Sequence, residues 1–586
     1  MNNKDDLVIR VAGESGDGST ATGEMLAQAA ARSGLQVFTF RTTPAEIRGG
    51  PVMFQVRASN APVRSQGDAV DVLFAFNQEA WDLHHADLVA PGVLLYDPEN
   101  VTPPEHFSGI AYPVPIGRIA QQAGSRRGKN VVALAVAAAL FGLGRSKLED
   151  VVRARLGKKA ALLEANLAAL HAGMAYAQGL AKLDPLWLEA SSEHERLVLT
   201  GNQAIVAGAL HAGVRFFAGY PITPASDIME GMAAILPEIG GAFLQAEDEI
   251  ASAMACVGAS FGGAKSMTAT SGPGLALMSE AIGYASMTEL PLVVVDAQRG
   301  GPSTGLPTKM EQSDLNLALY GGHGDSPRIV LAPGSVAECF HLTVWGFNLA
   351  ETYQSPVIIL SDYSLSFRTE TVAPFDLAKY PVIDRQTPAA PLQPGRYQRY
   401  YVNGSYVSPM ALPGMTSGQY TATGLEHDAF GHPDYSSARH VEMSEKRWRK
   451  LEPLRHSHDY VRRFGAERAR VGLLCWGTTA GPCRGALFLA AQQGLPLALL
   501  QVQMLAPLPV DAIRAFVESV ELVLVPELNY QGQFARLVQA ELGIRVASFT
   551  QYTGMPFTRH AILHRVHELL GIDAPVEAPG SAVARA

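Results

Sequence analysis

Residues 219–224, Gly-Tyr-Pro-Ile-Thr-Pro, are the part of this sequence best suited to hold a side chain in a fixed position. They follow the apolar run Val214–Ala218, which predicts a strand. The two prolines exclude a regular helix or an inner strand, and each pushes the residue before it toward extended geometry. The pattern predicts a stiff loop that displays the Thr223 hydroxyl at a strand end, where α/β sheets bind ligands. A rigid turn without chemistry is the alternative.

Three acidic side chains gather where a second strand is expected to give way to a helix. Glu247, Asp248 and Glu249 precede a run of small residues that predicts a helix over Glu249–Phe261. The positive end of a helix dipole favours an ionised acid, and a carboxylate in a dry place can serve acid–base chemistry. Glu249 is the candidate for that role. The alternative is that all three acids only complete a helix start.

An arginine and a glycine-rich loop follow the strand expected at Leu292–Asp296. The planar guanidinium of Arg299 can hold a carboxylate through two parallel hydrogen bonds. It opens the loop Arg299–Thr308, whose glycines let the backbone approach a ligand. An arginine in a flexible surface loop is the alternative. The strand-to-helix loop Thr270–Gly274, Thr-Ser-Gly-Pro-Gly, is equally consistent with lining a pocket and with tight packing.

A second glycine loop lies near the N-terminus, between the strand expected at Leu7–Val11 and a helix. Gly16-x-Gly18-x-x-Ala21 fits the dinucleotide fingerprint, which is a weak signal by itself. The next strand ends at Phe40-Arg41-Thr42-Thr43 without an acid to bind a ribose diol, which counts against NAD. A purely structural role for this loop is the alternative.

Size and composition limit the possible functions. A chain of 586 residues should hold about three domains. The net charge of −9 argues against a sequence-independent grip on DNA or RNA. The start of the sequence has no secretory pattern, and the longest apolar run, Val131–Leu143, is too short to span a bilayer and predicts a buried helix. We therefore expect a cytoplasmic protein without membrane or nucleic-acid partners.

The four cysteines form no metal or cluster pattern. They show neither a C-x-x-C pair nor ferredoxin-like spacing, and no histidine cluster completes a zinc site. We expect buried thiols and no metal in this chain. The cysteines are Cys256, Cys339, Cys475 and Cys483.

The order of strands and helices predicts an α/β protein with three consecutive open-sheet domains. We expect these domains over residues 1–185, 197–385 and 470–572, with an ordered connection over 386–465 and a flexible tail over 573–586. In the first domain, alternating strands and helices predict a largely parallel sheet. Helices are expected over Gln203–Ala212 and Leu275–Met287, and a strand is expected over Ser266–Thr270.

The connection and the third domain carry three weaker signals. His427 with Asp428 can orient a substrate or a thiol, although a loop histidine is more often solvated or locally hydrogen-bonded. The basic run Glu445–Lys450 predicts a solvated helix face. The segment Glu527–Gly532 predicts helix capping and an interface.

Together, four segments resemble the α subunit of the 2-oxoacid:ferredoxin oxidoreductases, in the form with a γ domain fused at its N-terminus. These segments are Tyr220–Pro224, Gln245–Ala253, Thr270–Gly274 and Gln298–Thr308. The stretch Gly418–His427 is most similar to the branch that acts on 2-oxoglutarate, the 2-oxoglutarate synthases. The resemblance implies a γ domain, a thiamine pyrimidine-binding domain and a transketolase C-terminal-like domain, in that order.

The resemblance assigns roles to individual residues. It places the acid that binds the pyrimidine of thiamine diphosphate at Glu249, as the catalytic residue, with Pro221 and Ser271 also touching that cofactor. It places contacts to the 2-oxoacid at Thr223, Arg299 and Thr308. For coenzyme A it suggests Gly16, Gly18 and Arg41 of the N-terminal loop. The distal carboxylate of 2-oxoglutarate needs a further cation, for which Lys309 and Arg48 are candidates.

Part of a thiamine site is missing from the sequence. Thiamine enzymes hold Mg²⁺ and the diphosphate with Gly-Asp-Gly followed at a short interval by Asn. Here Gly16-Asp17-Gly18 lies in the first domain, and the next asparagine, Asn60, is too distant. The resemblance therefore implies a β subunit that carries the diphosphate, Mg²⁺ and a [4Fe-4S] cluster, with ferredoxin as a further partner and a dimer of αβ heterodimers as the assembly.

The implied reaction is the oxidative decarboxylation of 2-oxoglutarate with coenzyme A to succinyl-CoA, CO₂ and reduced ferredoxin. Because the reaction is reversible, it can also serve a reductive tricarboxylic acid cycle. The alternatives are the same chemistry on pyruvate or branched-chain 2-oxoacids, or a nucleotide-binding assembly subunit without catalytic groups.

Overall fold

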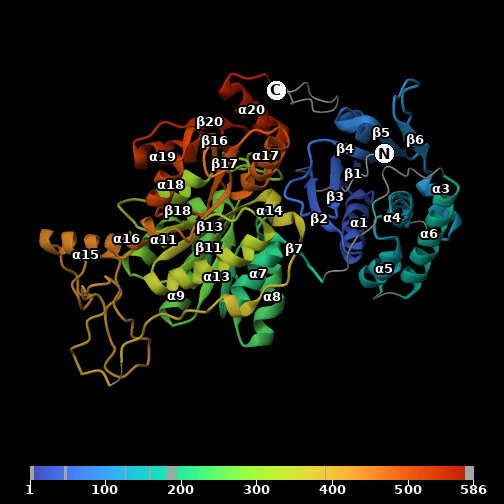
Figure 1. Ribbon diagram of the computed structural model, residues 1–586. Coiled ribbons are helices and arrows are strands. Elements are labelled where there is room, and N and C mark those ends of the chain that lie inside the picture. The colour runs from blue at the N-terminus through green and yellow to red at the C-terminus, as the bar shows by residue number, and fades with distance from the viewer. Residues whose placement is uncertain are drawn as a thin grey trace. The chain divides into compact units, whose positions relative to one another are not determined.

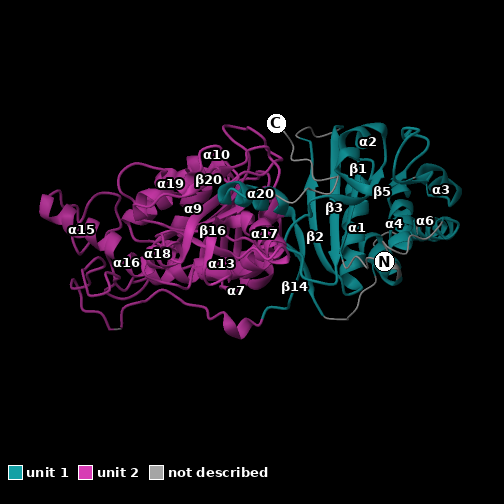
Figure 2. Ribbon diagram, turned by 45° about the horizontal axis from the view of Figure 1, so that its top comes forward, with its two compact units in different colours: residues 1–200, 367–375, 558–586 teal, residues 201–366, 376–557 magenta. Residues whose placement is uncertain are grey.

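The computed structural model describes residues 6–44, 49–125, 127–157, 160–180, 188, 195–389 and 391–573. They fall into two compact units, one of residues 1–200, 367–375 and 558–586 and one of residues 201–366 and 376–557 (Figure 2). Three open sheets of eight, seven and five strands, with helices packed on them, confirm the predicted α/β fold class (Figure 1). Arg48 and the tail from residue 574 lie outside the described residues.

The sheet of the first unit is mixed, so the prediction of a largely parallel sheet was wrong. Its strands, in order, are β6 (Ile110–Pro113), β5 (Leu88–Tyr96), β4 (Val70–Ala75), β1 (Asp6–Glu14), β3 (Pro51–Ser59), β2 (Gln36–Thr42), β14 (Thr369–Val372) and β7 (Leu197–Thr200). Strands β6, β5, β4 and β1 are parallel, whereas the remaining pairs are antiparallel. Only residues 43–50 link β2 to β3, whereas a parallel crossover needs about a dozen residues or more.

Helices, several of them rich in alanine, accompany this sheet in the first unit. The helices of the first unit are α1 (Ser19–Arg32), α2 (Gln78–His84), α3 (Ile116–Gln122), α4 (Lys129–Phe141), α5 (Leu148–Leu156), α6 (Ala160–Gln178) and α20 (Arg559–Leu570). All residues of Val131–Phe141 are buried, which confirms the predicted buried helix. Gly23 lets α1 approach β3, because a Cβ there would overlap the Phe54 ring. In the described part of the chain, no helix has the length and apolar character needed to cross a bilayer.

The second sheet carries most of the predicted site. Its strands, in order, are β18 (Met504–Ala506), β12 (Ile329–Leu331), β13 (Pro356–Asp362), β11 (Leu292–Gln298), β10 (Ser266–Thr270), β8 (Phe216–Gly219) and β9 (Ala242–Gln245). All neighbours are parallel except β18, which is antiparallel to β12. The strand β10 has the predicted bounds, as does the helix over Glu249–Phe261.

Short and long helices surround this second sheet. They are α7 (Gly201–His211), α8 (Ser226–Ile235), α9 (Glu249–Phe261), α10 (Gly272–Leu277), α11 (Ser279–Met287), α12 (Leu315–Tyr320), α13 (Val336–Tyr353) and α14 (Tyr363–Phe367). The helix predicted over Leu275–Met287 is divided at Met278 into α10 and α11. As a result, α10 begins inside the loop Thr270–Gly274, and this loop is drawn tightly under the helix start.

The third sheet shares one continuous apolar core with the second. Its strands, in order, are β15 (Val461–Gly465), β17 (Leu497–Val502), β16 (Ala469–Trp476), β19 (Val520–Glu527) and β20 (Ala547–Thr550), and its helices are α17 (Ala480–Gln492), α18 (Val510–Val517) and α19 (Gln533–Leu542). The Glu527 carboxylate accepts hydrogen bonds from the backbone N–H groups of Phe534 and Ala535 at 2.7 and 3.0 Å. This contact confirms the predicted capping by Glu527–Gly532.

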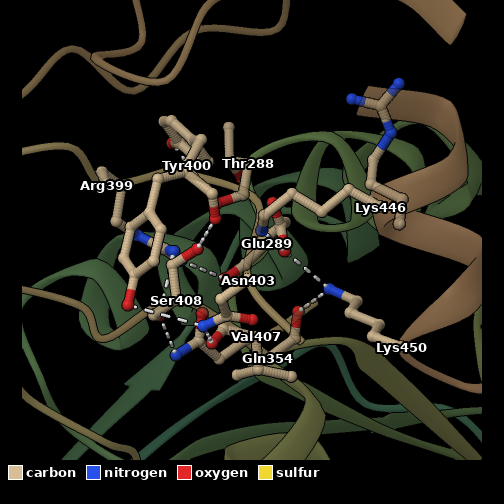
Figure 3. A network of polar contacts seen from close by, with 12 residues as sticks. Thr288, Glu289, Gln354, Arg399, Tyr400, Asn403, Val407, Ser408, Lys446 and Lys450 are labelled. Carbon is tan, nitrogen blue, oxygen red and sulfur yellow. Dashed lines mark hydrogen bonds and ion pairs between the residues drawn. The ribbon is translucent and has the colours of Figure 1, made fainter. Parts of the chain in front are cut away.

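Buried charges fix the connection to the turn between α11 and β11. Besides β15 it contains α15 (Ser437–Arg449) and α16 (Glu452–Arg455). Lys446 donates to both carboxylate oxygens of Glu289, at 2.6 and 2.8 Å, and Lys450 donates to Oε2 at 3.0 Å (Figure 3). Arg399 donates to the Glu289 carbonyl oxygen at 2.8 Å. We call these four buried residues, Glu289, Arg399, Lys446 and Lys450, the lysine network.

The prediction of a solvated basic face over Glu445–Lys450 was therefore wrong. Lys446 and Lys450 are buried, because their partner Glu289 lies in the turn between α11 and β11, far away in the sequence. Lys446 lies on α15 and Lys450 directly follows that helix, which is seen at the left of Figure 1.

The isolated histidine and the cysteines are buried. His427 is fully buried, its Nδ1 lies 2.8 Å from the Leu425 carbonyl oxygen, and its ring packs on Tyr400 at 4.2 Å between centroids. These contacts favour the local hydrogen-bonding role over a substrate role. All four cysteines are free and buried, as predicted, and burial raises the pKa of Cys256 to about 12.

Candidate active site

Four neighbouring strands of the second sheet bring the predicted site residues to one edge. Strands β11, β10, β8 and β9 lie side by side and run parallel, so their carboxyl ends share that edge. The predicted residues follow the strands one by one: Tyr220–Pro224 after β8, Glu249 after β9, Ser271 after β10 and Arg299 after β11. Ligands of open α/β sheets bind outside such carboxyl ends, so the topology favours one shared site.

Arg299 joins the proline-containing loop to the glycine-rich loop. Its Nη1 donates a hydrogen bond to the Thr223 carbonyl oxygen at 2.7 Å. Asn202 holds the same loop from α7, with Nδ2 donating to the Pro224 carbonyl oxygen at 2.9 Å. Pro221 and Thr223 are exposed in this chain, so their side chains are open to a ligand or a partner. The structure thus places Thr223 and Arg299, both predicted substrate contacts, next to each other.

The three acids at the start of α9 have separate environments. Glu247 is exposed, and Asp248 caps the helix by accepting the Ala251 N–H at 2.8 Å. Glu249 turns inward and is only 6% exposed. Its side chain lies against Gly274, where a Cβ would be 2.7 Å from Glu249 Cγ and Oε1. The same Cβ would lie only 1.9 Å from Thr270 Oγ1, so only glycine fits at position 274 without displacing Thr270 and Glu249.

Ser271 is a buried polar group without a partner. It is fully buried, and its hydroxyl has no hydrogen-bond partner within the described residues. Such orphaned groups need an explanation, because an unsatisfied buried hydroxyl is unfavourable. Its place between β10 and α10, in the loop whose Gly274 lies against Glu249, fits a site that receives a polar ligand.

The two ends of the loop that Arg299 opens meet. The Gly300 N–H donates to the Lys309 carbonyl oxygen at 3.0 Å, and the Leu306 N–H donates to the Gly300 carbonyl oxygen at 2.9 Å. Thr308 and Lys309 are half-buried at the far end of this loop. Burial lowers the pKa of Lys309, with no carboxylate of the described residues offsetting the effect. Lys309 is therefore a partly desolvated cation whose backbone is hydrogen-bonded to Gly300, the residue after Arg299.

Two acids beside Arg299 were missed by the sequence reasoning. We call Asp296 and Asp314 the acid pair. Asp296 is fully buried near the end of β11, and both of its carboxylate oxygens lack hydrogen-bond partners within the described residues. Burial and the charge of Asp314 raise the pKa of Asp296 well above its ordinary value. The signal that could have found it is an acid ending the apolar strand Leu-Val-Val-Val-Asp.

The charge of Arg299 is shaped by the same acids. The guanidinium is 9% exposed, and its Nε lacks a partner within the described part of the chain. Burial lowers the pKa of Arg299, and the nearby charges of Asp314 and Asp296 counteract this effect. Burial and Glu311 raise the pKa of Asp314 to about 7, although Arg299 acts against the rise.

The third sheet holds the segment that carries Asp314. Gln312 is fully buried, and its Nε2 donates to the Trp476 carbonyl oxygen at 2.9 Å while its Oε1 accepts the Leu528 N–H at 3.1 Å. Gln533 on α19 donates to the Ser313 carbonyl oxygen at 2.8 Å. The predicted interface at Glu527–Gly532 therefore includes an internal contact with the site segment.

The Asp17 side chain occupies backbone donors of the N-terminal glycine loop. Asp17 accepts the Ser19 N–H at 2.8 Å and the Glu14 N–H at 2.7 Å, so it takes two amides that a phosphate would use. Gly16 and Gly18 have φ of 97° and 96°, which favours glycine. Arg41 stacks over the Phe367 ring, 3.8 Å from its centroid. These contacts favour the structural alternative for the loop, and a phosphate there must use other donors.

Large apolar side chains are exposed on the elements that carry the site. They are Tyr220, Leu244, Ile250, Met254 and Leu277, each between 41% and 50% exposed. Apolar surface of this kind marks a contact with another molecule more often than a free surface.

Two family models match the chain. Residues 207–447 match the model described as "Pyruvate flavodoxin/ferredoxin oxidoreductase, thiamine diP-bdg", and residues 8–176 match "Pyruvate ferredoxin/flavodoxin oxidoreductase".

Relatives match over nearly the whole length. The chain is 33% identical to the 2-oxoglutarate oxidoreductase subunit KorA of Mycobacterium tuberculosis, over 94% of this chain and 90% of that protein. It is 30% identical to the 2-oxoacid:ferredoxin oxidoreductase subunit alpha of a Sulfolobus species, over 94% of each. A solved structure of the 2-oxoglutarate:ferredoxin oxidoreductase from Magnetococcus marinus, with 2-oxoglutarate, coenzyme A and succinyl-CoA bound, matches with a TM-score of 0.92 and 44% identity over 96% of this chain and 99% of that one.

Proposed function

The chain belongs to the 2-oxoacid:ferredoxin oxidoreductase family, and we propose that it is the α subunit, with fused γ domain, of a 2-oxoglutarate:ferredoxin oxidoreductase. The reaction is the oxidative decarboxylation of 2-oxoglutarate with coenzyme A to succinyl-CoA, CO₂ and reduced ferredoxin. The family resemblance drawn from the motifs is thereby confirmed. For the domains we propose the predicted division, with the γ domain at 1–185, the pyrimidine-binding domain at 197–385 and the transketolase-like domain at 470–572.

The observation that carries this proposal is the buried carboxylate of Glu249 on the same sheet edge as the Arg299–Thr223 contact. The residues fit a thiamine pyrimidine, because Glu249 is buried and the Ser271 hydroxyl, which has no partner among the described residues, is free to bond a ligand. Glycine at position 274 leaves the Glu249 side chain in place, whereas any larger residue there would overlap it. When bound, thiamine diphosphate supplies the nucleophilic carbon that a 2-oxoacid needs to lose CO₂.

We propose that this chain's own residues position the reactants. Glu249 holds a pyrimidine nitrogen and its proton, in a place that excludes bulk water. Pro221 and Ser271 contact the same ring. Arg299 binds the 1-carboxylate of the substrate through its guanidinium, and Thr223 and Thr308 orient the rest of the 2-oxoacid.

A β subunit is the proposed partner that completes the site. The missing Asn of the diphosphate motif and the exposed apolar side chains around Glu249 support a partner at this edge. That subunit carries the diphosphate, Mg²⁺ and a [4Fe-4S] cluster, and ferredoxin receives the electrons. We further propose a dimer of αβ heterodimers in the cytoplasm, working in either direction and so able to serve a reductive tricarboxylic acid cycle.

Coenzyme A is the proposed acyl acceptor. Gly16, Gly18 and Arg41 remain the proposed contacts in the first unit, with Asp17 and Phe367 as the groups that a phosphate would have to displace. Replacing Asp17 by Ala tests this placement, since it frees two amides and is expected to lower the KM for coenzyme A if the loop binds phosphate.

Lys309 is the proposed partner of the distal carboxylate. It is a half-buried cation on the loop opened by Arg299, and its stem is confined by Gly554, where a Cβ would be 2.8 Å from Lys309 Cβ. Replacing Lys309 by Met is expected to lower kcat/KM for 2-oxoglutarate by roughly 10- to 100-fold, the worth of a charged hydrogen bond. Turnover of 2-oxobutyrate, which lacks that carboxylate, is expected to stay unchanged. Equal losses on both substrates would contradict this role.

The proposed function is tested by co-purifying the chain with its β subunit and measuring viologen reduction with coenzyme A and a panel of 2-oxoacids. We expect the highest kcat/KM with 2-oxoglutarate. A preference for pyruvate or a branched-chain 2-oxoacid would transfer the proposal to that substrate. If a complex loaded with cofactor reduces viologen with none of them, the chain is an assembly subunit without catalysis.

A further inference from the structure

The acid pair has no role in the proposed function, although it lies beside the proposed substrate anchor. Asp296 is fully buried, and neither of its carboxylate oxygens meets a donor within the described residues. The Oδ2 atom of Asp314 is enclosed and lacks a partner there as well. An ionised carboxylate without donors is among the least favourable groups to bury. The pair therefore needs a physical explanation.

The backbone brings the two acids to the same end of β11. Side chains alternate along a strand, so Asp296 and Gln298 lie on one face of β11. Gln298 Oε1 accepts the Asp314 N–H at 3.2 Å, which holds Asp314 at the end of that face. From the side of α10, Gly272 makes room for Asp314, since a Cβ there would be 2.7 and 2.8 Å from its carboxylate oxygens. Strand β10 completes the arrangement, with Thr270 directly opposite Asp296.

The local charges do not balance if both acids are ionised. Arg299 is the cation whose charge acts on both members of the pair, and Glu311 adds a further negative charge beside Asp314. Glu249 lies beyond the glycine loop, against Gly274. Two carboxyl groups in a dry site near one cation reach neutrality by holding a single proton between them. Burial acts to raise the pKa of both acids, so the state in which both are ionised is disfavoured.

We propose that Asp296 and Asp314 share one proton and act as a positioning pair that sets the charge Arg299 presents to the 1-carboxylate of a 2-oxoacid. This inference rests on the proposed function, in which Arg299 is the anchor. With the proton present, the pair carries one negative charge, which the guanidinium balances. Loss of the proton adds a second negative charge and opposes the arriving carboxylate. By reciprocity, substrate binding strengthens the hold of the pair on its proton.

The test is the pH dependence of KM and kcat for 2-oxoglutarate in the αβ complex, measured from pH 6 to 9 by viologen reduction. In the wild type we expect KM to rise above neutral pH, toward a limit of about tenfold per pH unit, while kcat changes little. Asp314→Asn removes the proton-sharing partner and is expected to give a KM that is flat with pH. Asp314→Glu keeps a carboxyl group and is expected to restore the slope.

A matched control and a second readout keep the inference separate from folding and from turnover. Glu230→Gln changes an exposed acid of α8 in the same unit and is expected to follow the wild type. Infrared difference spectra between wild type and Asp314→Asn report a protonated carboxyl group without any substrate. We expect its carbonyl band at pH 6.5 in the wild type and its loss in the variant; Asp296→Asn is expected to lose it too.

Two outcomes would overturn the inference. One is an unchanged KM slope in Asp314→Asn, and the other is the absence of a protonated carboxyl band in the wild type at pH 6.5. If the wild-type complex turns over no 2-oxoacid, the proposed function fails instead. The infrared spectra then still decide whether the acid pair holds its proton.

Discussion

The second unit contains two buried charge clusters that treat their carboxylates in opposite ways. In the lysine network, the Glu289 carboxylate accepts three hydrogen bonds from two lysines. In the acid pair, neither oxygen of Asp296 has a donor within the described residues. Burial acts to raise the pKa of Glu289, but Lys446, Lys450 and Arg399 together hold it far below its ordinary value. The pKa of Asp296 is shifted in the other direction.

This difference separates structure from function. A carboxylate whose hydrogen bonds are all made within the protein stabilises the fold, and the lysine network accordingly fixes the connection to the turn between α11 and β11. An unsaturated one keeps capacity for a proton, a cofactor or a substrate, at the expense of stability. The Ser271 hydroxyl and Arg299 Nε are, like the acid pair, buried without a hydrogen-bond partner within the described residues. The comparison predicts that changes in the lysine network lower stability, whereas changes in the acid pair alter turnover without lowering stability.

The largest effect that sharpens this comparison is expected from Gly274→Ala. The added Cβ would lie 1.9 Å from Thr270 Oγ1 and 2.7 Å from Glu249 Oε1, so both side chains would have to move. Displacing a catalytic group by about 1 Å costs roughly 100-fold in rate, so we expect kcat/KM to fall by about that factor. Gly283→Ala is the matched control, because a Cβ on that α11 residue meets nothing within 4 Å. Similar losses in both variants would contradict the steric account.

The next largest effect is on stability, and it is expected from a substitution that breaks the lysine network. Glu289→Gln leaves Lys446 and Lys450 buried without a counter-charge, which typically destabilises by about 3–5 kcal/mol. We expect the thermal midpoint of the complex to fall strongly, while kcat/KM of the folded enzyme at low temperature stays near that of the wild type. Lys446→Met leaves Glu289 paired with Lys450 and is expected to cost less. A Glu289→Gln variant that loses turnover but keeps its thermal midpoint would contradict a structural role for the lysine network.

The smallest effect is a gain in stability from Asp314→Asn. The pKa of Asp314 is raised from 3.8 to about 7, so between these pH values the folded state keeps a proton that the unfolded state has lost. Wild-type stability therefore declines as pH rises through this window. We expect the variant to melt several degrees above the wild type at pH 8 and to match it below pH 4, by calorimetry. A variant that is less stable at pH 8 would make Asp314 structural.

Local patterns in the sequence predicted most of the edge of the second sheet. The bounds of α9 and β10 follow from acids, small residues and glycines that act within a few positions of each other. The gathering of Thr223, Glu249 and Arg299 follows from parallel strands that end at one edge. These features need no knowledge of distant partners, so a single sequence contains them.

Distant partners account for what was missed. The basic run of α15 looks solvated until Glu289, which follows α11, is brought against it. Asp314 acquires its role only when Gly272 and Gln298 close around it. The mixed sheet of the first unit depends on strand β3 inserting between β1 and β2. The alternation of strands and helices along the sequence does not indicate which strands become neighbours.

Glu249 is the carboxylate on which the whole account depends, and Glu249→Gln in the co-purified αβ complex tests it most directly. Viologen reduction with 2-oxoglutarate and coenzyme A is measured at equal occupancy of β subunit and thiamine diphosphate. We expect turnover to fall by roughly 10²- to 10⁴-fold, with the β subunit still bound and the thermal midpoint unchanged. Turnover within a few-fold of the wild type would contradict the account.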